Sequence, residues 1–78
     1  MKDKLNKTIQ KLSSEASYAI HAATLSKEIS EMSFWFGNYW GVMDCLEKLD
    51  YETWKSLLEE HKVVREYCGR CVGRRSLN

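Results

Sequence analysis

Apolar side chains recur at alternating spacings of four and three residues in the first part of the chain, and the large ones precede the small ones. The stripe consists of Leu5, Ile9, Leu12, Ala16, Ala19 or Ile20, and Ala23. A helix with about 3.6 residues per turn places these positions on one face, so residues 3 to 23 are predicted to be helical. The small side chains from Ala16 to Ala23 predict that another helix crosses closely there.

A second stripe with the same spacing predicts a helix over residues 26 to 49. It consists of Leu25, Ile29, Met32, Phe36, Tyr39, Met43 and Leu46. The two stripes point in roughly opposite directions, so one straight helix could not present both to a single neighbour. Ser26 is an acceptable N-cap and favours a break between the helices. The absence of Gly and Pro from residues 22 to 28 favours one continuous helix, and both interpretations stay open.

A third helix is predicted over residues 51 to 68. Asp50 can cap its first amides, and Glu52 places a negative charge in its first turn. Its apolar stripe is Trp54, Leu57, Leu58, His61, Val64 and Cys68. Gly69 is typical of a helix stop, which leaves residues 69 to 78 as a short basic tail. With no proline and no alternating apolar pattern, the chain is predicted to be all-α, with two to three helices in a helical hairpin or small bundle.

The length of the chain is by itself a reason to expect a binding partner. A chain of 78 residues forms one domain with a small core, so dimerisation is expected to complete the bundle. The net charge of +1 indicates neither a strongly acidic nor a strongly basic surface. The first residues lack the apolar core of a signal peptide, and the longest uncharged run is shorter than the ~20 residues of a membrane span. We therefore expect a cytoplasmic protein that does not enter the membrane.

The segment SFWFGNYWGVM, residues 33 to 43, holds five aromatic residues and two glycines without a single charge. On a helix, Phe36, Tyr39 and Met43 belong to the core stripe. The opposite side carries Phe34, Gly37, Gly41 and Cys45, with Trp35 and Trp40 on the flanks. A helix that is apolar all round is normally buried, and two other helices cannot surround it.

The two glycines indicate what covers this side. Each costs about 1 kcal/mol relative to Ala inside a helix, and glycines one turn apart allow another backbone to approach closely. The alternative is that Gly37 marks a kink or loop. The predicted contact surface for a second copy of the chain or for a different protein comprises Phe34, Trp35, Gly37, Trp40 and Gly41.

Cys68 and Cys71 have the spacing of half a tetrahedral zinc site. Cys45 with His61 or His21 could supply the other ligands, or two chains could each contribute a pair. A redox dithiol is a second interpretation, although such motifs open a helix and this one closes a helix. The third is that Cys68 packs as a small apolar residue and that His61 is a hydrogen-bonded core histidine.

Basic residues near the C-terminus keep nucleic-acid binding as an alternative function. The candidate phosphate contacts are Arg70, Arg74 and Arg75. No catalytic triad, phosphate-binding loop or paired carboxylates can be assembled, so the chain is predicted not to be an enzyme. Its length, its use of Lys and Glu and its short helices have the general look of small accessory proteins of phages and mobile elements. We therefore expect a homodimeric regulator or inhibitor that acts by binding another protein.

Overall fold

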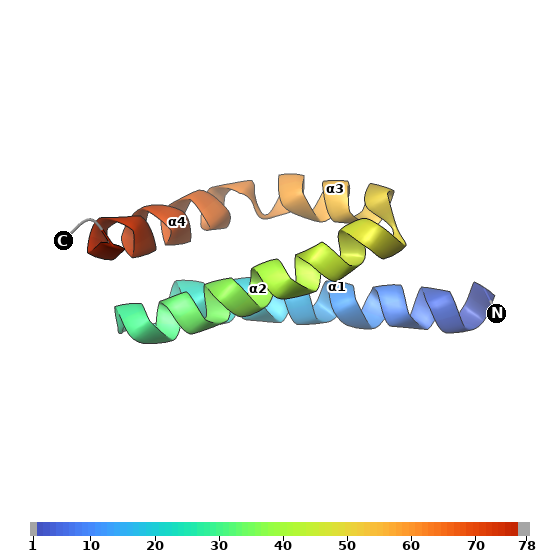
Figure 1. Ribbon diagram of the computed structural model, residues 1–78, viewed down its shortest axis with the longest axis horizontal. Coiled ribbons are helices and arrows are strands. Elements are labelled where there is room, and N and C mark those ends of the chain that lie inside the picture. The colour runs from blue at the N-terminus through green and yellow to red at the C-terminus, as the bar shows by residue number, and fades with distance from the viewer. Residues whose placement is uncertain (1, 77–78) are drawn as a thin grey trace.

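The computed structural model describes the backbone of residues 2–76 and the side chains of residues 3–73. It contains four helices: α1 (Lys2–Leu25), α2 (Ile29–Leu49), α3 (Tyr51–Glu60) and α4 (Lys62–Ser76). Helices α1 and α2 form an antiparallel hairpin, and α3 and α4 run back over it one after the other (Figure 1). The prediction of an all-α small bundle is confirmed, with four helices in place of two or three.

The chain breaks between the first two helices, which is one of the two interpretations that the sequence left open. Residues 26 to 28 are not helical, and α2 begins at Ile29. Ser26 does not cap α2, because its hydroxyl donates a hydrogen bond of 2.8 Å to the carbonyl of Ala22 in the last turn of α1. The N-cap position of α2 is Glu28, whose side chain makes no capping hydrogen bond. Of the two open interpretations, the structure therefore shows the break, and the predicted capping role of Ser26 is wrong.

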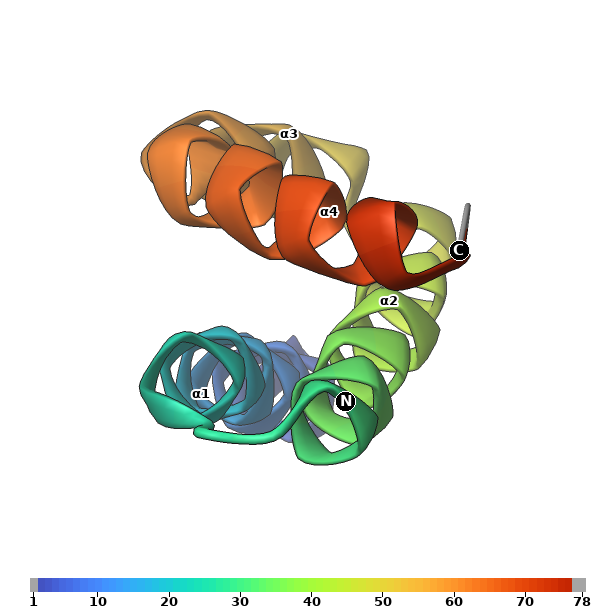
Figure 2. The same cartoon turned by 90° about the vertical axis from the view of Figure 1, so that its left-hand side faces the viewer.

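The predicted third helix is two helices in the structure, separated at His61. The amide of His61 still donates to the Leu57 carbonyl at 2.9 Å, and the Arg65 amide donates to the His61 carbonyl at 2.8 Å. The Arg65 side chain donates a further hydrogen bond of 2.8 Å to the carbonyl of Leu58, just before the break. The interruption is thus one residue long. Helices α3 and α4, which together form the α3–α4 arm, follow one another along the long axis of the molecule (Figure 1), and the end-on view shows that the chain turns sideways between them (Figure 2).

The helix does not stop at Gly69. Helix α4 continues to Ser76, so the expected tail begins as helix. Among the described residues, no glycine has a positive φ angle, and Gly69 therefore lacks the left-handed conformation of a helix-ending glycine. A Cβ atom at Gly69 would lie 4.0 Å from the ring of Phe36, which places this glycine against α2.

The core lies where the hairpin meets the α3–α4 arm. Its fully buried members come from three helices: Ala16, Ala19, Ile20 and Ala23 of α1, Tyr39, Met43 and Leu46 of α2, and Cys68 of α4. The close helix crossing that the small side chains predicted is confirmed, because α1 contacts both α2 and α4. Seen end-on, α1, α2 and the α3–α4 arm enclose this core from three sides (Figure 2). Within the described chain, no helix has the length and apolar character required to cross a membrane.

Candidate interaction surface on helix α2

Helix α2 has one buried face and one face that no other helix covers. Its buried residues are Met32, Tyr39, Met43 and Leu46. On the other side, six exposed residues follow one another at alternating spacings of three and four: Glu31, Phe34, Asn38, Gly41, Cys45 and Lys48. We call these six residues the outer stripe. Gly37 lies beside it and is also exposed. The side of α2 predicted to need a cover is therefore open to solvent in the single chain.

Phe34 is the large apolar side chain of the outer stripe, and 65% of its surface is exposed. Its ring packs edge-on against Trp35, with 5.3 Å between the ring centroids. Trp35 in turn packs edge-on against Tyr18 of α1, at 5.5 Å. The neighbouring aromatic rings thus support Phe34 from one side and leave its outer side free. Exposed aromatic side chains of this kind are common centres of protein–protein contacts.

Neither Gly37 nor Gly41 is required by packing within the described chain. Helix α2 continues through both positions, so the interpretation of Gly37 as a kink or loop is wrong. A Cβ atom built at either glycine would meet nothing within 4 Å. Alanine would therefore fit, and it would favour the helix by about 1 kcal/mol at each position. The cost of these glycines is explained if another backbone approaches this face.

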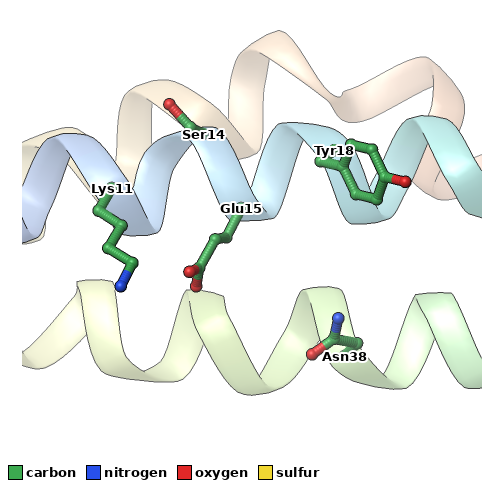
Figure 3. A pocket seen from close by; sticks show the side chains of 5 residues that line it. All are labelled: Lys11, Ser14, Glu15, Tyr18 and Asn38. Carbon is green, nitrogen blue, oxygen red and sulfur yellow. The ribbon is translucent and has the colours of Figure 1, made fainter.

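An open groove adjoins the outer stripe at Asn38. It has a volume of about 390 Å³ and runs between α1 and α2, lined by Lys11, Ser14, Glu15, Tyr18 and Asn38. Lys11 and Glu15 extend from α1 toward α2, whereas Ser14 points away from it (Figure 3). The hairpin thus presents a hollow with charged side chains beside Asn38 of the outer stripe.

Trp40 does not share the surface of Phe34. Its ring packs edge-on against Tyr39 at 5.3 Å and against Phe36 at 5.9 Å. The guanidinium carbon of Arg65 lies 5.9 Å from the centre of the Trp40 ring, a cation–π contact with α4. The five predicted contact residues are therefore divided. Phe34, Gly37 and Gly41 lie on the open side, Trp35 faces α1 and Trp40 faces α4.

His61 is part of a buried polar network at the junction of α3 and α4. It is only 4% exposed. Its Nδ1 atom lies 3.2 Å from the hydroxyl of Tyr39, and its Nε2 atom lies 3.4 Å from the hydroxyl of Ser17. Burial raises the pKa of Tyr39 to about 12, so this hydroxyl keeps its proton. The network joins α1, α2 and the α3–α4 junction, with both ring nitrogens of His61 in contact with hydroxyl groups.

Acid is expected to destabilise the chain through His61. Burial lowers the pKa of His61 in the folded chain below the ordinary value of 6.5. The negative charge of Glu60 acts in the opposite direction and raises this pKa, but burial has the larger effect. The unfolded chain therefore binds a proton more readily, and the free energy of unfolding falls as the pH drops below 6.5. The slope is at most about 1.4 kcal/mol per pH unit. Denaturant titrations between pH 7.5 and 5 measure it.

A substitution of His61 itself tests this pH dependence. His61→Gln keeps polar contacts and removes the titrating group, so its stability should change less with pH than that of the wild type. Equal pH dependence in the wild type and His61→Gln would contradict the assignment.

The four zinc candidates are not brought into one site. His61 contacts Tyr39 and Ser17, and Cys45 lies on the outer stripe. Cys68 is buried with its sulfur 3.9 Å from the Thr24 hydroxyl, and burial raises the pKa of this thiol. Among the described residues, no three His, Cys, Asp or Glu side chains come together to hold a metal ion. A raised pKa also makes Cys68 a poor redox nucleophile.

The basic residues divide in a similar way. Arg70 is exposed on α4, and Arg65 is turned toward Trp40 and the Leu58 carbonyl. The side chains of Arg74 and Arg75 lie outside the described residues. The structure therefore places one of the three predicted phosphate contacts on the surface, and the other two are not described.

No protein-family model, curated protein or solved structure matches this chain. A functional proposal for this chain therefore rests on the geometry of the described residues. Helical spacing alone, continued through polar positions, would have added Glu31, Asn38 and Lys48 to the predicted surface. These three side chains carry a charge or an amide, so a pattern of apolar residues does not include them.

Proposed function

We propose that this chain is a non-enzymatic interaction protein that acts by binding protein partners through the outer stripe of α2 and is itself a homodimer. The observation that carries the proposal is the exposed ring of Phe34 beside two helical glycines with empty space around them. An aromatic anchor next to a flat strip fits a close helix–helix contact. A twofold dimer is the commonest way for such a surface to be covered.

The small size of the protein fits a role as a regulator or inhibitor, of the kind that phages and mobile elements encode. A chain of 9.2 kDa can act by occupying or bridging surfaces of larger proteins. Such a role requires a binding surface and no catalytic group. In this proposal, the outer stripe is the surface that the protein uses.

The mass of the protein in solution tests the proposal. Sedimentation equilibrium over a wide range of concentrations is expected to show a transition from 9.2 kDa to twice that mass. A chain that keeps the mass of a single copy up to millimolar concentration would contradict the homodimer.

A further inference from the structure

The outer stripe carries opposite charges at its two ends. Glu31 lies near the start of α2 and Lys48 near its end, and both side chains are exposed. The four positions between them, Phe34, Asn38, Gly41 and Cys45, are uncharged. At about 1.5 Å per residue, the two charges are about 25 Å apart along the helix. Within the described residues, neither takes part in an ion pair, so both are free to pair with another molecule.

We infer that a second copy of the chain packs on the outer stripe with the two α2 helices antiparallel, so that each Glu31 lies beside Lys48 of the partner subunit. The inference rests on the proposed function and specifies its partner and orientation. Figure 2 shows α2 at the edge of the bundle, and all six side chains of the outer stripe are exposed. The partner can therefore approach without moving another helix.

Charge selects the orientation of the pair. In a parallel dimer, the two Glu31 side chains would face each other, and so would the two Lys48 side chains. Like charges at short distance repel, and two such contacts oppose this arrangement. In the antiparallel dimer, the same four side chains form two attractive pairs related by the twofold axis.

Side-chain size agrees with the register that the charges set. When Glu31 lies beside Lys48 of the partner subunit, Phe34 lies beside Cys45 of the partner subunit. Asn38 then lies beside Gly41 of the partner subunit, at the centre of the contact. Each large side chain thus meets a small one, as interdigitating helices require. A shift of the partner by two helical turns would separate both charged pairs and break this match.

Reversing the charges tests the orientation. Glu31→Lys and Lys48→Glu each convert two attractive contacts into two repulsive ones, and each should weaken the dimer about tenfold. The double variant Glu31→Lys/Lys48→Glu should recover to within about threefold of the wild type. Sedimentation equilibrium at low salt measures all four proteins. A dimer of unchanged strength in both single variants, or a double variant weaker than either, would overturn the inference.

A disulfide trap tests the register. Phe34→Cys removes the aromatic anchor, so the trap uses protein at millimolar concentration to offset the weaker association. The new thiol should then lie beside Cys45 of the partner subunit, and mild oxidation should give a covalent dimer linked between positions 34 and 45. The matched control Phe34→Cys/Cys45→Ser should give no such dimer. Wild-type chains should not link through Cys45, because the two Cys45 residues are about 16 Å apart along the helices, beyond the reach of a disulfide.

The outcomes separate this inference from the proposed function. Rapid Cys45-to-Cys45 linkage in the wild type, or persistent linkage in the Cys45→Ser control, would indicate a parallel pair and overturn the inference, while the homodimer would stand. A wild type that never dimerises would instead refute the homodimer itself. Peptide mass spectrometry identifies which cysteines are joined.

Discussion

The variant Gly41→Leu is expected to be monomeric while it keeps its helices. Gly41 lies at the centre of the outer stripe, and a leucine there would fill the space that the partner helix occupies in the proposed dimer. Overpacking costs about 1–3 kcal/mol at a close contact, and the twofold axis applies it twice. The dimer should therefore weaken about 30-fold or more. In the single chain, a Cβ atom at Gly41 meets nothing within 4 Å, so the fold should hold.

Two further variants separate the effect of a bulky side chain at position 41 from the effect of removing a glycine from a helix. Gly41→Ala should stabilise the single chain by about 0.5–1 kcal/mol, through helix propensity alone. Gly73→Leu is a matched control, because an added Cβ there also meets nothing within 4 Å and the residue lies on α4. It should leave the dimer unchanged. If Gly41→Leu dimerises as strongly as Gly73→Leu, the outer stripe is not the contact.

The variant Leu46→Ala is expected to lose about 2–5 kcal/mol of stability, which is most of what a domain of this size has. Leu46 is fully buried between α2 and the rest of the core. Removing its side chain gives up buried apolar area and leaves a cavity that the surrounding helices fill only in part. Denaturant titration followed by circular dichroism measures the loss.

Leu49→Ala is the control for this prediction, one turn further along the same helix. Leu49 is 44% exposed, so the same substitution there should cost less than about 1 kcal/mol. Equal losses at Leu46 and Leu49 would contradict the assignment of the buried face of α2.

The hydrophobic spacing of the sequence was sufficient to predict the first two helices and their shared core. The opposite directions of the two stripes left two possibilities, a break or one long helix with different partners on its two halves, and the small residues from Ala16 to Ala23 predicted a close neighbour. Both features depend on local periodicity, which a sequence displays directly. The packing of Gly69 against Phe36 depends on two residues far apart in the sequence. A local rule that treats glycine as a helix stop therefore ended the last helix too early.

The candidate surface was predictable in part for a similar reason. A helical wheel separates Phe34, Gly37 and Gly41 from the core stripe, and the structure leaves all three exposed. A helical wheel does not predict which neighbouring helix each flank of α2 contacts. The contact of Trp40 with Arg65 depends on the path of α4, which local spacing does not define. The same limit applies to His61, whose partners come from two other helices.

The central claim is that a second copy covers the outer stripe of α2, and Cys45 reports on this directly. Cys45 is exposed in the single chain, whereas Cys68 is buried and Cys71 is partly buried. The alkylation rate of each thiol can be followed by peptide mass spectrometry over a range of protein concentrations. We predict that Cys45 reacts rapidly in dilute protein and more slowly as the concentration rises, and that it stays reactive in Gly41→Leu. A Cys45 alkylation rate that is the same at every concentration would contradict the claim.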